Sequence, residues 1–199
     1  MNLRLTRHEI DTLREKFRKR PALVHREVQL ALDRTGQRIV ATMKREGFRG
    51  APSSLAVRTG QLRRGFFANV KMEGNKAKLT VANDTAYARI HEYGGVITAK
   101  NRKYLAIPLS AAKTGAGVAR FPGGPRSVPD LVFIQRRGRN PLLMRPMGKG
   151  KLVPYYVLVR SVKIPARLGM RRTFLKSITG PRSDLQTELR QAVKRVVNG

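Results

Sequence analysis

The sequence has no cysteine, no tryptophan and few acidic residues. Without cysteine it has no disulfide bonds, zinc knuckles or thiol nucleophile, which fits assembly in a reducing cytoplasm. Aromatic residues make up 6% of the 199 residues, so we do not expect a sheet face covered with base-stacking rings. No apolar run approaches the ~20 residues that a membrane span requires. The N-terminus is charged and lacks an apolar signal segment, so we expect no export signal and no membrane partner.

Positive charge is what the sequence has in excess. Lysine and arginine total 42 against 12 aspartate and glutamate residues, which gives a formal net charge of +30. Apolar residues make up 41% of the chain, which is enough for a hydrophobic core. Residues 100–172 contain 17 basic residues and one acidic residue, Asp130. Because this segment would repel itself in an isolated monomer, we expect it to face a polyanion or the acidic surface of a neighbouring protein.

Apolar residues at three- and four-residue spacing predict helices near both ends of the sequence. The first 46 residues predict two helices. The first ends before Pro21, because the residue that precedes a proline avoids the helical region. The second stretch is expected to end at Gly47. Ser183 followed by Gln186 is a capping-box pattern and predicts the start of a C-terminal helix. Residues 51–64 are expected to form a loop that leads into a short helical turn.

Alternating apolar residues predict strands in the middle of the sequence. One hairpin is centred on residues 73–75, and a second, strongly basic hairpin is centred on residues 136–140. Single strands are expected over residues 104–108 and 153–162. These segments make the sequence a mixture of helices and short antiparallel strands.

Two basic segments are candidates for contacts with partners. Residues 109–131 are rich in alanine, glycine, proline and serine and show no period, so they predict a long loop. With little apolar surface to bury, this loop is expected to be mobile until it docks on a neighbour, with Phe121 as its single apolar anchor. Arginines at the turn of the basic hairpin can bind phosphates or carboxylates through paired hydrogen bonds. The candidate contact residues are Lys113, Arg120, Arg126, Arg136, Arg137 and Arg139.

The sequence shows no constellation of catalytic or metal-binding residues. Its histidines, His8, His25 and His91, are far apart and lack a metal-ligand spacing. Most carboxylates stand beside basic residues, whereas a metal-dependent nuclease requires several of them around one site. Residues 115–117 lack the further glycine and the helix of a dinucleotide-binding loop. We therefore predict no catalytic residue, no metal site and no cofactor.

Three separated motifs occur in a characteristic order. The first is Thr59-Gly60-Gln61-Leu62-Arg63-Arg64, directly before the predicted hairpin. The second is Tyr87-Ala88-Arg89-Ile90-His91-Glu92-Tyr93-Gly94, and the third is Lys163-Ile164-Pro165-Ala166-Arg167. In motif order, spacing and basic composition, the chain resembles the neck and tail-completion proteins of tailed bacteriophages. The basic stretch from Val132 to Ile178 is similar to the minor tail protein Z branch of that group.

The resemblance implies an α+β fold, in which one antiparallel sheet is packed by the second N-terminal helix and by the C-terminal helix. Residues 21–199 are then a single domain, residues 1–20 a charged helical arm, and residues 109–131 an inserted loop. The chain departs from the family pattern at residues 168–170, where a proline and an aromatic residue usually follow, so the start of the terminal helix is less well defined.

The resemblance also implies a structural role in the virion, after assembly in the host cytoplasm. Such proteins form rings, usually six-fold, between the head connector and the tail tube and around the path of the exiting DNA. The expected partners are other copies of the chain, the connector, the tail terminator or tube proteins, and DNA in a non-specific manner. An enzymatic role is not implied.

The motif residues are expected to act structurally. Gly60, Gly94 and Gly95 would permit turn geometries closed to other residues, Pro165 would fix the chain before the terminal segment, and Glu92 would pair with Arg63 or Arg167. In the family the second motif lies at the end of a strand. The motif positions are Thr59, Gly60, Leu62, Arg63, Tyr87, Glu92, Gly94, Pro165 and Arg167.

An RNA-binding protein of the ribosomal type is the alternative that composition supports. Small size, high positive charge, absence of cysteine and basic hairpins suit it equally well. The order of the three motifs favours the tail-completion reading, because RNA-binding proteins have no reason to show it. A phage nuclease or packaging enzyme is disfavoured by the scarcity of carboxylates.

Overall fold

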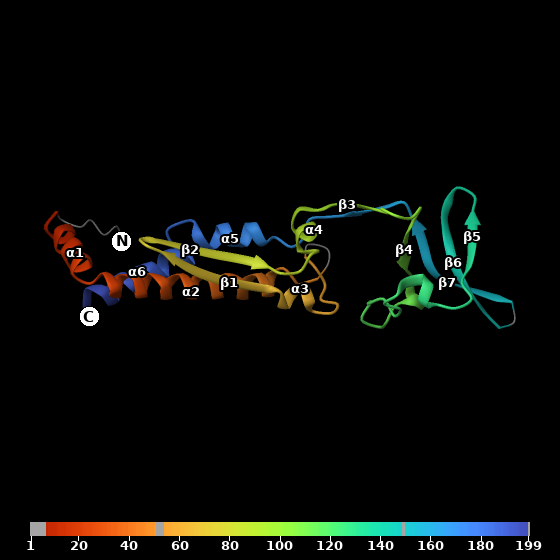
Figure 1. Cartoon of the computed structure of the whole chain (residues 1–199), viewed down its shortest axis with the longest axis horizontal. Coiled ribbons are helices and arrows are strands. Elements are labelled where there is room, and N and C mark those ends of the chain that lie inside the picture. Colours follow the sequence, from red (N-terminus) through yellow and green to blue (C-terminus); the bar gives the residue numbers. More distant parts are fainter. Residues whose placement is uncertain (1–6, 51–53, 149, 199) are drawn as a thin grey trace. The chain divides into compact units, whose positions relative to one another are not determined.

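The computed structural model of the chain describes residues 7–50, 54–148 and 150–198 (Figure 1). The parts of the predicted N-terminal arm and of the predicted 51–64 loop that fall in residues 1–6 and 51–53 lie outside this range. The chain forms two compact units. Unit 1 comprises Met1–Leu55, Gln61–Ala88 and Leu168–Gly199, and unit 2 comprises Ala56–Gly60 and Arg89–Arg167. The division into a helical arm over residues 1–20 and one domain over residues 21–199 stays a prediction.

Unit 1 contains most of the helices, and the local signals in the sequence explain their ends. Pro21 occupies the first turn of its helix, where its missing N–H costs nothing. That helix ends with the Gly47 N–H donating to the carbonyl of Met43 at 2.9 Å. At the last helix the Gln186 N–H donates to the Ser183 hydroxyl at 3.3 Å, which confirms the predicted cap. The helices are α1 (Arg7–Lys19), α2 (Pro21–Glu46), α3 (Gln61–Arg64), α5 (Met170–Ile178) and α6 (Asp184–Asn198).

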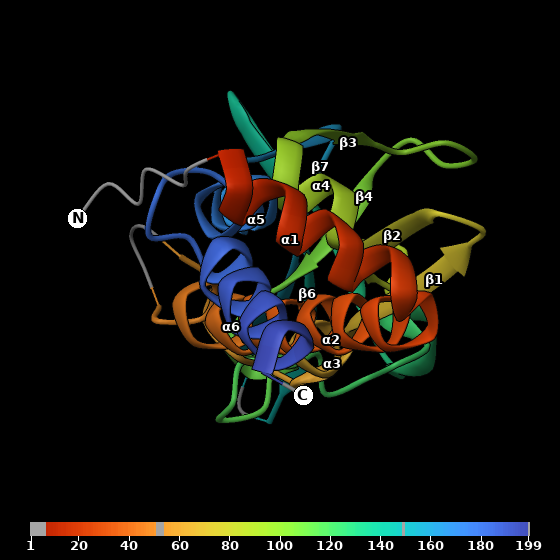
Figure 2. The same ribbon diagram turned by 90° about the vertical axis from the view of Figure 1, so that its left-hand side faces the viewer.

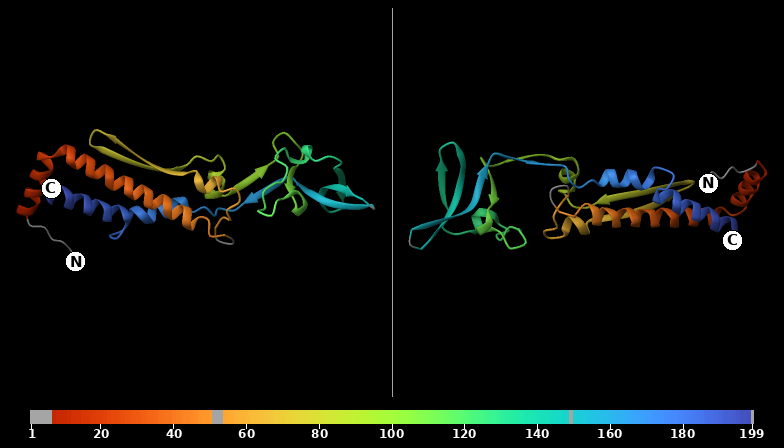
Figure 3. Two further views of the ribbon diagram at one scale, coloured as in Figure 1. Left: turned by 90° about the horizontal axis from the view of Figure 1, so that it is seen from below. Right: turned by 180° about the vertical axis from the view of Figure 1, so that it is seen from behind.

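The first hairpin lies along α2 in unit 1 (Figure 3). Strands β1 (Phe66–Glu73) and β2 (Lys76–Asn83) pair in register around the predicted turn. Gly36 permits the close approach, since a Cβ at this position would lie 2.8 Å from the Ala68 Cβ. The core beneath is a cluster of buried side chains: Ile39, Met43, Leu62, Phe66, Ala88 and Leu168.

The C-terminal helix α6 packs along α2 (Figure 2), so it is α2 that lies against both the strands and α6. Glu188 on α6 is 1% exposed, and its Oε1 lies 2.8 Å from Nη2 of Arg38 on α2. Its Oε2 lies 3.8 Å from Nη1 of Arg34. A second pair joins Glu27 of α2 to Arg195 of α6. The two helices are therefore connected by carboxylates that are withdrawn from water, which is costly unless each is paired.

Unit 2 contains two separate antiparallel sheets, so the described residues form three sheets where the sequence predicted one. Strand β3 (Gly95–Thr98) pairs with β8 (Ser161–Ile164) in a two-stranded ribbon. The other sheet has four strands in the order β4-β7-β6-β5. Its strands are β4 (Leu105–Pro108), β7 (Lys151–Val159), β6 (Arg139–Met147) and β5 (Val132–Arg136). The single strand that was expected over residues 153–162 is divided between β7 and β8.

The segment between β4 and β5 is packed more closely than the sequence suggested. It contains two 3₁₀ helices, η1 (Ser110–Ala112) and η2 (Gly124–Ser127). Ala112 and Val128 are buried with Tyr155 and Tyr156 of β7, and Arg58 donates to the carbonyl of Ala116 at 2.8 Å. The expectation that residues 109–131 have little apolar surface to bury is therefore wrong, because small side chains here pack against two large tyrosines.

The α+β class predicted from the resemblance is confirmed. The second motif, however, is a short helix, α4 (Ala88–Tyr93), and not the end of a strand. Helix α5 was not predicted either; Gly169 precedes it with a φ of 68°. In the described part of the chain no helix is both long and apolar enough to span a membrane.

The buried ion pair between α2 and α6 should contribute more to stability than an exposed ion pair does. Arg38→Met would leave the buried Glu188 carboxylate with only the distant Arg34, so we expect a loss of about 3 kcal/mol in the free energy of unfolding. Arg45→Met removes an exposed pair with Glu46 at 3.8 Å and should cost under about 1 kcal/mol. Urea unfolding of both variants measures the difference; equal losses would contradict the proposed importance of the buried pair.

Candidate functional site

The first motif forms a turn that is fastened to the end of the β1–β2 hairpin. Gly60 has a φ of 74°, which a residue with a Cβ rarely adopts. The turn then enters α3, where Leu62 is buried in the core. The Asn83 amide donates to the carbonyl of Leu62 at 2.8 Å, and its oxygen accepts from the N–H of Thr85 at 3.0 Å. One side chain thus holds both the α3 turn and the chain that leaves β2.

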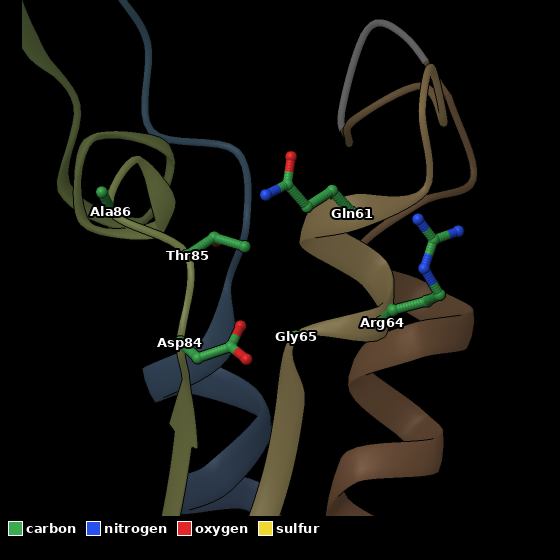
Figure 4. Close-up of a pocket in the computed structure, with 6 residues that line it drawn as sticks. All are labelled: Gln61, Arg64, Gly65, Asp84, Thr85 and Ala86. Atoms are coloured by element: carbon green, nitrogen blue, oxygen red, sulfur yellow. The ribbon is translucent and has the colours of Figure 1, made fainter.

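A small polar notch lies between this turn and the chain after β2 (Figure 4). Its volume is about 350 Å³. Gly65 forms its floor, and a Cβ there would overlap Oδ1 of Asp84. Beside it the Tyr87 hydroxyl lies 3.3 Å from Oε1 of Gln61, a hydrogen bond between the first two motifs. The lining residues are Gln61, Arg64, Gly65, Asp84, Thr85 and Ala86.

The notch offers one carboxylate, on Asp84, and one guanidinium, on Arg64 (Figure 4). General acid–base catalysis of hydrolysis commonly uses two carboxylates, and a catalytic metal needs at least three ligands. Within the described ranges, no group of three or more histidine, cysteine, aspartate or glutamate side chains could hold a metal ion. What the notch contains is a hydrogen-bonded junction between the α3 turn and the chain after β2.

The second and third motifs meet in unit 2. Helix α4 ends with the Gly94 N–H donating to the carbonyl of Ile90 at 2.9 Å, and the Arg167 N–H donates to the carbonyl of His91 at 2.8 Å. Gly94 has a φ of 72°, and a Cβ there would lie 3.1 Å from both the Ala166 nitrogen and the Ile164 oxygen. Two segments that are about 70 residues apart in the sequence are therefore in backbone contact, and only glycine fits between them.

The remaining motif residues lie around these contacts. Thr59, Arg63, Pro165 and Arg167 are exposed, and Glu92 is half-buried. The pairing of Glu92 with Arg63 or Arg167 and the structural roles of the motif positions stay predictions. Two residues that position the turn, Asn83 and Gly65, were not identified from the sequence. The run Asn83-Asp84-Thr85 after a strand is typical of a turn closed by an asparagine side chain, and could have indicated the first of them.

The candidate basic contacts differ in how freely they can bind a partner. At the turn of the β5–β6 hairpin, Arg136 donates to the carbonyl of Asn140 from Nε at 3.0 Å and from Nη2 at 2.7 Å. It therefore closes the hairpin, whereas Arg137 and Arg139 are exposed. In the segment before β5, Lys113 is half-buried and Arg120 is exposed. Arg126 in η2 is also exposed.

The close approach at Gly94 predicts a specific sensitivity. Gly94→Ala combines a left-handed φ with a contact against backbone atoms that cannot rotate away, so we expect a loss of more than about 2 kcal/mol in unfolding free energy. Gly124 has a φ of 70° but open space around its Cβ position, so Gly124→Ala isolates the conformational cost alone, about 1 kcal/mol. Thermal or urea unfolding compares the two; similar losses would show that the contact with residues 164–166 is unimportant.

His91 predicts a dependence of stability on pH. Burial lowers the pKa of His91 below its ordinary value of 6.5, because the charged imidazolium is poorly hydrated there. The unfolded chain then binds the proton more readily than the folded chain. The free energy of unfolding is therefore highest above about pH 6.5, and it declines as the pH falls from there toward the lower pKa of the folded state. Unfolding measured between neutral and acidic pH should show a smaller decline in His91→Gln than in the unmodified protein; parallel curves would contradict this.

Comparison with known proteins agrees with these features. Residues 11–94 match the family model described as "Bacteriophage HK97-gp10, putative tail-component". The match spans α2, the first motif, the β1–β2 hairpin and the second motif, whereas the third motif lies outside it. No significant match is found among curated proteins or among solved structures. Over residues 11–94 the chain is thus similar to a family of phage tail components, which confirms the resemblance that its motifs indicated.

Proposed function

We propose that the protein is a structural component of a phage tail that completes the tail at the neck, in a ring of copies around the path of the exiting DNA. The observation that carries this proposal is the family match over residues 11–94, which includes two of the three sequence motifs. A ring of six copies is the arrangement that the resemblance implies. The protein would then be located in the virion, between the head connector and the tail tube.

The motif positions are proposed to be structural in this role. Gly60 and Leu62 shape the α3 turn, and the hydrogen bond between Tyr87 and Gln61 connects that turn to the second motif. In unit 2, Gly94 lies against residues 164–166. Thr59, Arg63, Glu92, Pro165 and Arg167 would complete these two junctions. Each junction holds a turn at the end of a strand or helix, where a neighbouring copy or protein could contact it.

Exposed apolar side chains on short strands support contacts between copies. Phe67 on β1 is 46% exposed, and Val96 and Ile97 on β3 are also exposed. Both of these strands belong to two-stranded ribbons, in which no further strand pairs with the outer edges among the described residues. Open edges with apolar side chains are surfaces that monomeric proteins normally avoid. A ring would cover part of them.

The charge of unit 2 supports contact with DNA or with acidic neighbours. Its residues include 17 basic and two acidic ones, Glu92 and Asp130. The acidic residues of unit 1, by contrast, include several that pair with arginine or lysine within that unit. Exposed basic residues such as Arg120 and Arg126 would contact phosphates without reading the bases.

Two measurements test this proposal. The copy number in purified virions, determined by electron microscopy of the neck, should be that of a ring; a single copy or a location outside the tail would contradict it. Binding to unrelated DNA duplexes across a salt series should be independent of sequence, with a slope of about 0.9 per phosphate contacted. A flat salt response, or a strong preference for one structured RNA, would favour the alternative of an RNA-binding protein.

A further inference from the structure

The four-stranded sheet of unit 2 has two edges of different character. At one edge, β4 has only four residues, all of them half-buried, and ends at Pro108, which has no N–H to offer. At the other edge, β5 contains no proline, and no strand pairs with its outer side in the part of the chain that the structure describes. Val132 and Phe133 on β5 are 43% and 49% exposed. The β5 edge is therefore open where the β4 edge is protected.

A row of side chains on one face of this sheet becomes steadily more exposed toward β5. Tyr156 on β7 pairs with Leu143 on β6, and Leu143 pairs with Phe133 on β5. Tyr156 is 2% exposed, Leu143 is half-buried against the same core, and Phe133 is half-exposed. Directly paired residues of neighbouring strands lie on the same face. One more strand beside β5 would cover Phe133 as β5 covers Leu143.

The end of β5 carries the positive charge that would select the partner. Arg136 is engaged with the carbonyl of Asn140, so the turn is held in place. Arg137 and Arg139 are exposed beside it and have no ion-pair partner within the described residues. Residues 131–148 contain no aspartate or glutamate at all. The β5–β6 hairpin therefore has no carboxylate of its own to neutralise these arginines.

We propose that β5 accepts an extended acidic segment of a partner protein as a fifth strand of this sheet. The open edge of β5 supplies backbone hydrogen bonds, Phe133 supplies an apolar contact, and Arg137 and Arg139 bind carboxylates near one end of the added strand. Duplex DNA fits this surface less well, because its phosphate backbone cannot continue a β-ladder and its stacked, paired bases cannot cover a phenylalanine. This inference goes beyond the proposed role in the tail and does not depend on it.

The test uses the full chain and designed peptides as probes. The acidic probe is a short, dye-labelled peptide of alternating valine and threonine with a glutamate pair at each end. One control peptide carries lysine pairs instead, and another has proline at alternate positions, so that it cannot form a ladder. Fluorescence anisotropy should show binding of the acidic probe alone. Hydrogen exchange should show that amides of residues 132–136 become protected when it binds.

Matched variants separate the contributions. Phe133→Ala should weaken binding of the acidic probe by about tenfold, whereas Phe67→Ala, which removes a similarly exposed phenylalanine from unit 1, should leave it unchanged. Arg137→Ser with Arg139→Ser should weaken it by about tenfold or more. The control is Lys100→Ser with Arg102→Ser, which makes the same change of charge at two exposed residues of the same unit. This control pair should weaken binding less.

Several outcomes would overturn the inference. Binding without protection of residues 132–136, or equal binding of the proline-containing probe, would mean simple charge attraction. If both pairs of serine substitutions weaken binding of the acidic probe equally, the binding is likewise simple charge attraction. If a DNA duplex binds through Arg137 and Arg139 while the acidic probe does not bind, the surface is a nucleic-acid contact instead. Because these readouts do not involve copy number or virions, they stand apart from the test of the ring.

Discussion

The packing of α6 along α2 depends on two carboxylates that the fold withdraws from water, Glu188 and Glu27. Each is held by an arginine whose side chain remains partly exposed, so the charge is compensated at the boundary between core and solvent. The sequence has 42 basic and 12 acidic residues, so carboxylates are the scarcer partners. Helix α2 also packs against the β1–β2 hairpin at Gly36, so this helix contacts both α6 and the hairpin of unit 1.

The second constraint is the distance between backbones at a few glycines. At Gly36 a helix and a hairpin come closer than any side chain would permit, and at Gly94 the end of α4 lies against residues 164–166. At Gly65 the close neighbour is a side chain, because a Cβ there would overlap Oδ1 of Asp84. Gly94 belongs to the second motif and lies against the third, whereas Gly36 lies outside the three motifs.

The two units differ in how many of their basic residues can pair with carboxylates of the same unit. In unit 1 many carboxylates pair internally, as between α2 and α6, while unit 2 has 17 basic residues and two acidic ones. Unneutralised charge of this density opposes close packing of copies unless anions or acidic surfaces compensate it. The open β5 edge and the exposed arginines at its end lie within this unit. Its surface is therefore suited to a partner, and the similarity of residues 11–94 to a phage tail component agrees with a protein that works by assembly.

Local chemistry in the sequence determined the helix ends at Pro21, Gly47 and Ser183 and the two hairpins, because each depends on neighbours within a few residues. The tertiary structure alone decided that the described strands form three sheets, that residues 88–93 form a helix, and that residues 109–131 pack on Tyr155 and Tyr156. It also decided which arginines meet Glu188. These features depend on contacts between residues far apart in the sequence, and neither periodicity nor turn signals carry information about such contacts.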